Sequence, residues 1–257
     1  MRNSKLARTL GAAMLGLGLL SSPAFAEDGF LYSGAFYDDR YSDTTFAIDA
    51  TQPFGRSGAG LRPYLDANLN LDSQTLNVDI PETLTDNYAL GALGLQFTNV
   101  AGFRAFAQIG VTARVGAVAA HEPGADFRGG AELSRSWRGL GTRRARYGNY
   151  YGSATYISRY RDAVLLNAVE EGRTFRYGTH AVDIYLRALL SFGSHGFYYT
   201  NYAEGTVGLR FHSPAVSRVT LSVEESTGLY LLRTSRPATQ SDAYHDFRIN
   251  LGYGLPF

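Results

Sequence analysis

The sequence predicts an all-β protein, a transmembrane antiparallel up-and-down β-barrel of about twelve strands. Three observations predict this fold: an N-terminal export signal, a period-two alternation of apolar and polar residues along most of the chain, and a C-terminal strand that ends on Phe257. Totals of ten or fourteen strands stay open, because alternating segments can be divided in more than one way.

Residues 1–26 form the first predicted unit, a secretory signal peptide. Basic residues precede an apolar run, and the small-residue motif that ends at Ala26 follows it, so we expect cleavage before Glu27. The apolar run is too short to cross a membrane as a helix. Residues 27–257 should then form one domain, the barrel, because no Pro/Ser-rich linker and no charge run divides them.

The composition after the signal excludes several classes of protein. It contains 21 Arg against 23 Asp plus Glu, no Lys and no Cys. A nearly neutral chain argues against nucleic-acid binding, and a chain without Lys cannot form a P-loop. An exported chain without Cys must be held by something other than disulfides, which a closed barrel provides. The exclusive use of Arg has two explanations: guanidinium groups that line a pore, or a GC-rich genome.

The strands follow from the alternation, taken in chain order. No stretch of 18 apolar residues follows the signal, whereas residues 103–115 alternate Phe, Ala, Ile and Val on one face with Arg, Gln and Thr on the other. Marking every such segment predicts strands at residues 29–38, 44–53, 61–71, 88–98, 103–115, 126–137, 145–160, 163–175, 181–192, 201–211, 217–231 and 243–257.

The connections between these strands divide into two kinds. If the first strand runs outward, the connections at the periplasmic end are all short and those at the outer end are mostly longer, as in outer-membrane barrels. Only the outer link near Arg161 and Asp162 is unusually tight. This inequality supports the barrel and its placement in a bacterial outer membrane.

The C-terminal segment is the strongest local signal. Six apolar or aromatic residues occupy every second position up to Phe257, and they alternate with polar residues and glycine from Asp246 to Gly252. This pattern resembles the terminal β-signal by which outer-membrane barrels are recognised for assembly. The 18 Tyr and 15 Phe, against one Trp, also suit interfacial aromatic girdles. The predicted assembly signal consists of Phe247, Ile249, Leu251, Tyr253, Leu255 and Phe257.

The faces opposite the apolar ones should line the lumen. In a barrel near the eight-strand limit such charges interlock and fill the interior, whereas wider barrels leave an aqueous path. Twelve strands fall between these limits, so a structural salt-bridge ladder and a selectivity lining both stay open. The predicted lumen residues are Tyr64, Asp66, Arg104, Arg114, Arg128, Glu132, Asp183, Tyr185, Arg187, Glu204, Arg210, Arg218, Glu224, Asp246 and Arg248.

The sequence offers little for catalysis, and we expect no enzyme, no catalytic residue and no cofactor. The pairs Ser194-His195 and His212-Ser213 are the candidates for lipid hydrolysis, but adjacent strand residues point to opposite faces and cannot contact each other. An acidic cluster of Asp38, Asp39 and Asp43 offers few ligands for a cation, so we expect a solvated loop and no metal site.

Three segments of the C-terminal third carry a family resemblance. Residues 198–204 (YYTNYAE), 207–211 (VGLRF) and 244–248 (YHDFR) resemble the barrel end of exopolysaccharide-export and phage-adsorption outer-membrane proteins. The resemblance implies a conduit for a polysaccharide, or a surface receptor. That family carries a long periplasmic helical-repeat region before its barrel, which this sequence lacks, so polymer export would need a separate periplasmic subunit.

These observations lead to three functional hypotheses. The first is an outer-membrane channel for a polar solute, with carbohydrate or exopolysaccharide as the expected cargo. The second is a closed structural or adhesive barrel that binds a partner through its outer loops, and the third is a lipid-modifying enzyme. The expected partners are outer-membrane lipid, the barrel-assembly machinery, a polysaccharide and a periplasmic export subunit, with no nucleic acid.

Overall fold

The computed structural model describes residues 29–39, 43–55, 58–73, 87–99, 101–115, 123–138, 145–196, 198–212, 218–232 and 241–256. The predicted signal peptide and the longest outer connections lie outside these ranges. The strands are β1 (Phe30–Asp38), β2 (Asp43–Pro53), β3 (Gly60–Asp72), β4 (Tyr88–Thr98), β5 (Phe103–Arg114), β6 (Gly124–Arg138), β7 (Ala145–Ile157), β8 (Asp162–Tyr177), β9 (His180–Gly193), β10 (Tyr202–His212), β11 (Val219–Tyr230) and β12 (Ala243–Pro256), with a 3-10 turn η1 (Tyr198–Thr200).

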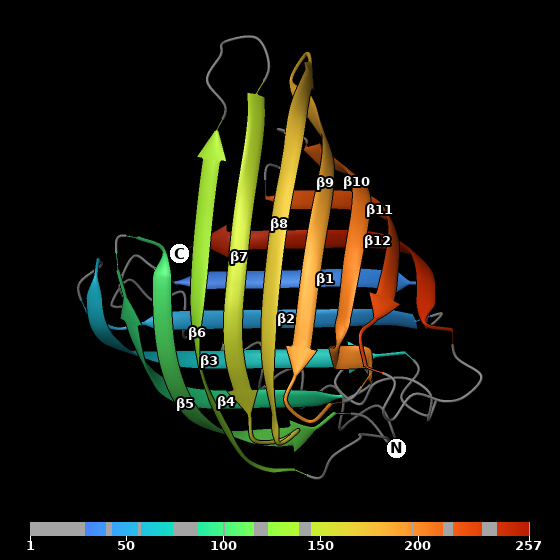
Figure 1. Ribbon diagram of the computed structural model, residues 1–257. Helices are drawn as coiled ribbons and strands as arrows, with labels where there is room; N and C mark the ends of the chain where they lie inside the picture. The colour runs from blue at the N-terminus through green and yellow to red at the C-terminus, as the bar shows by residue number, and fades with distance from the viewer. Residues whose placement is uncertain are drawn as a thin grey trace, which may run out of the picture.

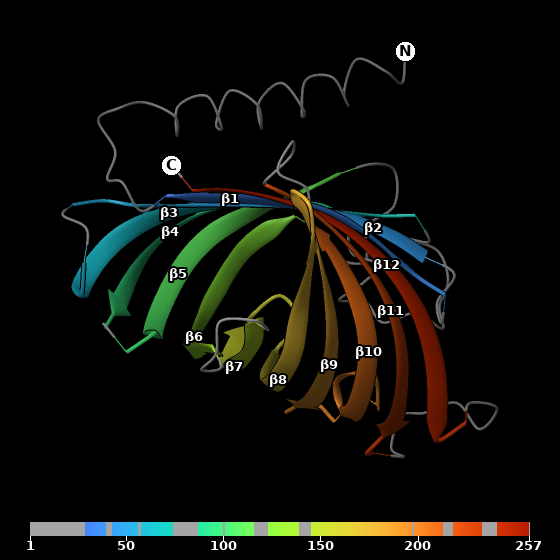
Figure 2. The ribbon, with the colours of Figure 1, turned by 90° about the horizontal axis from the view of Figure 1, so that it is seen from above.

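The twelve strands form one closed antiparallel barrel. Each strand pairs with its neighbours in the chain, and β1 closes the ring by pairing with β12 from Phe30 opposite Pro256 to Asp38 opposite Arg248. The ring is visible from above in Figure 2, and Figure 1 shows the strands of the front wall crossing those of the back wall. The crossing reflects the tilt that closure imposes. The predicted up-and-down barrel is confirmed.

The predicted strand ends agree with the observed ones to within three residues. The largest difference is at β7, predicted to reach residue 160 and ending at Ile157. The chain turns there through Ser158–Arg161, and Arg161 has a φ of 52°, a left-handed conformation that a strand cannot contain. The turn is closed by bonds from the amides of Tyr160 and Arg161 to the carbonyls of Ile157 and Ser158. The link predicted to be tight is therefore a tight turn.

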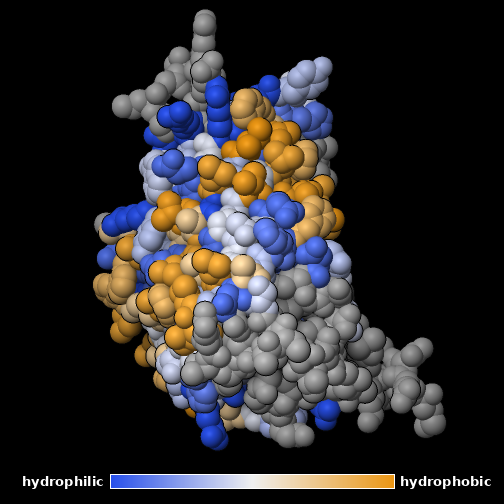
Figure 3. Space-filling view, turned by 45° about the vertical axis from the view of Figure 1, so that its right-hand side comes forward, coloured by the Kyte–Doolittle hydropathy of each residue, from blue (hydrophilic) through white to orange (hydrophobic). Residues whose placement is uncertain are grey.

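The barrel carries its apolar residues outside and its polar residues inside. On β5, Ile109 and Val111 are 64% and 67% exposed, whereas Gln108 and Thr112, which flank this pair, are buried. Figure 3 shows apolar residues gathered over the outer surface that it presents. No helix among the described residues is long and apolar enough to span a membrane. An apolar outer face around a polar interior defines a transmembrane β-barrel of the bacterial outer-membrane type.

The two ends of the barrel differ in their connections. The end where β1 begins has short turns, including Gly178 between β8 and β9 and the Asn99–Gly102 turn between β4 and β5. The other end carries the connections of residues 73–87 and 231–242. Outer-membrane barrels have short periplasmic turns and longer extracellular loops. We therefore name the first end periplasmic and the second end outer.

A recurrent feature of the inner face is a tyrosine directly opposite a glycine on the neighbouring strand. At each of these glycines an added Cβ would overlap the tyrosine ring, so the ring lies flat over the glycine and its hydroxyl reaches further around the wall. The glycines therefore make room for the polar site described next. The pairs are Tyr64 with Gly94, Tyr147 with Gly172, Tyr185 with Gly208, and Tyr244 with Gly228.

Candidate functional site: the lumen network

Three similar clusters, here called Tyr-Glu-Arg units, line the wall formed by β7 to β12. In the first unit, Glu224 on β11 accepts hydrogen bonds from both Nη atoms of Arg187, at 3.2 and 2.6 Å, and from the hydroxyl of Tyr185 at 2.5 Å. The bidentate geometry fixes the guanidinium plane against the carboxylate. Tyr185 reaches Glu224 across Gly208, so the Tyr–Gly pair positions the unit.

The second unit lies nearer the periplasmic end. Arg210 on β10 donates two hydrogen bonds of 2.9 Å to Glu170 on β8, and the Tyr147 hydroxyl donates to the same carboxylate at 3.3 Å. The Arg210 guanidinium also lies 4.4 Å from the ring centroid of Tyr185, a cation–π distance. Arg210 thus joins the first two units into one network.

The third unit joins β10 to β12. Arg248 donates two hydrogen bonds of 2.7 Å to Glu204, and the Tyr244 hydroxyl donates to Glu204 at 2.9 Å. Arg248 also pairs with Asp246 on its own strand and lies 3.6 Å from Asp38 on β1. One guanidinium therefore meets three carboxylates at the seam where the barrel closes, and the side chains of Glu204 and Asp246 are almost completely buried.

The opposite wall, formed by β3 to β6, has the same Tyr–Gly device but a different acceptor. The Tyr64 hydroxyl donates to Oε1 of Gln108 at 2.5 Å, and the Gln108 amide donates to Asp66 at 3.0 Å. Arg104 pairs with Glu132 through one contact of 3.3 Å. Here a neutral amide lies between the tyrosine and the carboxylate, and the ion pair is single rather than bidentate.

A further polar group lies toward the outer end of this wall. Arg128 donates to Asp126 at 2.9 Å and to the Tyr88 hydroxyl at 3.3 Å. Arg159, from the β7–β8 turn, donates to Thr112 at 2.9 Å and lies over the Tyr88 ring. The tight outer turn is therefore anchored to the inner wall.

The network runs around the wall. Each of these ion pairs joins residues on one strand or on strands no more than two places apart in the barrel order, as Arg187 on β9 joins Glu224 on β11. Between the walls lies a cavity of about 690 Å³, with Tyr88 of β4 on one side and Glu224, Arg248 and Tyr202 among its other lining residues. Toward the periplasmic end a second cavity of about 380 Å³ is lined mainly by polar and basic residues, Arg146 among them, together with Trp137.

The predicted lumen residues fall into three groups. Most of them belong to the networks above. Asp183 is buried and lies 2.8 Å from Nε2 of His212, near the periplasmic end. Arg114 and Arg218 are the exceptions: Arg114 is the exposed last residue of β5, and Arg218 precedes the first residue of β11, so the predicted start of that strand at 217 was too early.

Sequence reasoning missed several members of the networks. Glu170 is followed by Glu171, so the charge pattern does not say which of the two faces inward. Tyr147 lies in a segment of mixed tyrosine, glycine and asparagine that does not alternate by polarity. Gln108 had been placed on the correct face without a role. Once the register is known, the Tyr–Gly pairing is the signal that finds them. The missed residues are Tyr88, Gln108, Asp126, Tyr147, Glu170 and Tyr244.

The structure shows which partners the Ser and His candidates for catalysis contact. Ser194 Oγ and the backbone amide of His195 both donate to Asp162 Oδ1 at 2.9 Å. Nδ1 of the His195 ring lies 3.1 Å from the Arg161 carbonyl oxygen, so the two side chains have different partners. His212 faces Asp183, and Ser213 lies outside the described residues.

In the acidic cluster, Asp38 and Asp39 lie beside Asp246, with their oxygen atoms within 4.8 Å of one another. The Asp43 side chain lies outside the described part. Because Arg248 pairs with both Asp38 and Asp246, these carboxylates belong to the third unit.

The predicted assembly signal forms the outer face of the closing strand. Phe247, Ile249 and Leu251 of β12 are exposed on the outer surface, and β12 pairs with both β11 and β1. Phe257 lies outside the described residues. Recognition by the assembly machinery stays a prediction.

Comparison with known proteins identifies no family. No family model matches the sequence, and no curated protein matches it. Among solved structures, LpxR from Salmonella typhimurium is 12% identical over 87% of this chain and 99% of its own, with a TM-score of 0.44. The beta domain of the Bordetella autotransporter BrkA is 12% identical over 89% and 98% of the two chains, with a TM-score of 0.43. The KdgM porin, in complex with disordered oligogalacturonate, is 8% identical over 87% and 98%, with a TM-score of 0.37. Likenesses of this size do not extend to function.

Proposed function

We propose that this protein is an outer-membrane channel for a polar solute, with carbohydrate as the solute class. The observation that supports this function best is the course of the ion pairs around the wall. A plugged barrel would need side chains that bond across the lumen, between strands about six places apart in a ring of twelve. The pairs named above span two places at most and leave a cavity of about 690 Å³ between the walls.

The chemistry of the lining supports an uncharged or weakly charged solute. In the first two Tyr-Glu-Arg units one carboxylate neutralises one guanidinium, so this part of the wall offers many hydrogen-bond donors and acceptors without a large field of one sign. The third unit carries an excess of carboxylates at the seam. The cavity also includes the rings of Tyr32, Tyr88 and Tyr202, which present flat amphipathic faces. Hydroxyl-rich molecules fit both features. The polymer of an exopolysaccharide-export system, suggested by the C-terminal resemblance, belongs to this solute class.

The experiment is single-channel recording in planar bilayers. We expect stepwise conductance from the wild type and a reversible block by neutral oligosaccharides. Replacing Arg187 and Glu224 together, as Arg187→Gln with Glu224→Gln, removes both charges without leaving either buried alone. Because hydrogen bonds to charged groups contribute about 1.5–3 kcal/mol each, the block should weaken about tenfold or more.

Arg135→Gln is the matched control, because Arg135 faces away from the lumen, in the same row as the exposed Val169, and should leave the block unchanged. A correctly folded wild type without conductance would refute the channel. If the wild type conducts but neutral oligosaccharides do not block it, and the double variant behaves like the wild type, carbohydrate is refuted as the solute and the channel is kept.

A further inference from the structure

The outward-facing surface of the barrel carries a basic patch that the proposed channel does not use. In the described strands, the arginines that face outward are Arg135, Arg146 and Arg173, on the adjacent strands β6, β7 and β8. The register establishes their direction, because residues directly opposite in a sheet share a face. Arg146 is opposite Arg173, which is opposite the exposed Ile184. Arg135 is opposite Tyr150, in the same row as the exposed Val169.

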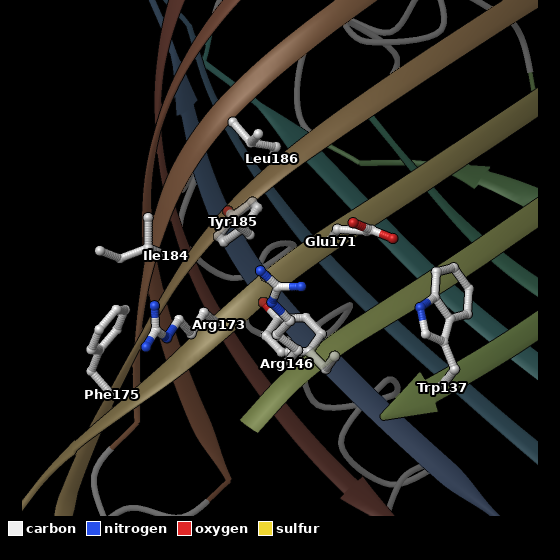
Figure 4. A pocket seen from close by; sticks show the side chains of 10 residues that line it. Trp137, Arg146, Glu171, Arg173, Phe175, Ile184, Tyr185 and Leu186 are labelled. Carbon is white, nitrogen blue, oxygen red and sulfur yellow. The ribbon is translucent and has the colours of Figure 1, made fainter. Parts of the chain in front are cut away.

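Arg146 and Arg173 of the patch line a groove of about 480 Å³ on this face of the barrel. Trp137 lies over Gly148, its direct partner on β7, and Gly148 continues the row to Glu171 and Leu186. Figure 4 shows the guanidinium groups of Arg146 and Arg173 in the groove, with Phe175 beside Arg173 and the Glu171 carboxylate directed toward Trp137. The groove therefore combines basic groups with aromatic and aliphatic side chains.

The arginines of the patch have no ion-pair partner among the residues that the structure describes. No ion pair joins Arg135, Arg146 or Arg173 to a carboxylate of the described residues; the Arg173 guanidinium contacts a ring, 5.0 Å from the centroid of Phe175. Two guanidinium groups directly opposite each other on one face repel, unless an anion lies between them. Among the described residues that line the groove, Glu171 is the one carboxylate, against two arginines.

The position of the patch identifies the anion. β6 ends at Arg138, β7 begins at Ala145 and β8 ends at Tyr177, so the three arginines lie near the periplasmic end of their strands. Arginine on the lipid face is costly at the bilayer centre and tolerated near the interface. A tryptophan between them is typical of the interfacial belt. The periplasmic end of the barrel, where the three arginines lie, is next to the lipid headgroups of the inner leaflet.

We propose that Arg146 and Arg173, assisted by Arg135, bind the phosphate headgroup of an acidic phospholipid in the inner leaflet of the outer membrane. Ile184, Leu186 and Phe175 then contact the start of its acyl chains, and Trp137 borders the headgroup. This site is independent of the channel, because its side chains leave the barrel on the face opposite the lumen network.

Native mass spectrometry of the intact barrel in mild detergent tests the site, with added phosphatidylglycerol as the probe and phosphatidylcholine as the neutral comparison. We expect a phosphatidylglycerol adduct on the wild type. In Arg146→Gln with Arg173→Gln it should weaken about tenfold or more, because each basic residue near an anionic surface contributes about a factor of five. Arg176→Gln, on β8 but facing inward, should bind like the wild type. Glu171→Gln should bind more tightly, because it removes a repelling charge.

Equal binding of phosphatidylglycerol by the wild type and the double variant would overturn the proposal. So would equal binding of phosphatidylcholine, or displacement of the lipid by inorganic phosphate at the same concentration, which would indicate a site for free phosphate. Heat-modifiable migration in gel electrophoresis verifies that every variant is folded. The Glu171→Gln arm keeps the proposal falsifiable if the double variant fails to fold.

Discussion

The two walls of the lumen share the Tyr–Gly pairing, but the tyrosine hydroxyl donates its hydrogen bond to a different acceptor in each wall. On the β7–β12 wall the tyrosine hydroxyl meets a glutamate that already holds an arginine through two hydrogen bonds. On the β3–β6 wall Tyr64 meets the amide of Gln108. The glutamate side chains of the first wall are 1%, 4% and 10% exposed, against 25% for Glu132 of the second. The β7–β12 wall is a network of buried ion pairs, and the β3–β6 wall is a more exposed, hydrogen-bonded surface.

This difference indicates where each wall obtains its rigidity. Buried bidentate pairs hold guanidinium planes in fixed orientations, and breaking one leaves a charge without compensation. A single pair that water reaches is screened and contributes little to stability. We therefore expect the β7–β12 wall to stay rigid while Arg104 and Glu132 adapt to a solute.

The largest expected effect comes from Arg248→Met. Glu204 and Asp246 would stay buried without their shared cation, and removing one partner of a buried pair costs about 3–5 kcal/mol. The midpoint of urea unfolding in detergent measures this loss. The second variant, Arg248→Met with Glu204→Gln, should recover part of it. A loss no greater than that of Arg104→Met would contradict the distinction between the walls.

Gly208→Ala should have an intermediate effect. Its Cβ would overlap the Tyr185 ring, so the ring must move and its bond to Glu224 must lengthen or break. Forcing extra atoms into a packed site costs about 1–3 kcal/mol. Gly205→Ala is the matched control on the same strand, because nothing lies within 4 Å of the added Cβ. Equal unfolding midpoints for the two variants would show that the Tyr–Gly pair does not support the unit.

Arg104→Met should have the smallest effect on stability. Its contact with Glu132 is 3.3 Å long and both side chains are about a quarter exposed, so the loss should be about 1 kcal/mol or less. The same urea measurement applies. Arg104→Met should weaken the block by oligosaccharide although it changes the urea midpoint little, because the Arg104 and Glu132 side chains are partly exposed to a solute in the lumen. A destabilisation as large as that of Arg248→Met would remove the contrast between the walls.

The sequence by itself determined the barrel, the position of its strands to within three residues, and the inner and outer faces of the strands that alternate clearly. A strand in lipid must alternate apolar and polar residues, and closure in lipid leaves no other arrangement for the backbone hydrogen bonds, so a local pattern implies a global fold. Residues such as Arg187, Glu204 and Arg248 were identified as lumen candidates for this reason. Strand ends were uncertain by a few residues, as at Arg218, because turns carry little periodic signal.

Only the tertiary structure decided which lumen residues act together. Arg187 and Glu224 are 37 residues apart in the chain, and Arg248 and Glu204 are 44 apart, so no local pattern joins them. Register between strands brings Tyr185 opposite Gly208 and lets its hydroxyl reach Glu224 two strands away. Alternation specifies the face on which a side chain lies, whereas register and barrel tilt select its partners. The outward direction of Arg146 and Arg173 also follows only from the strand pairing, because the residues around them do not alternate by polarity.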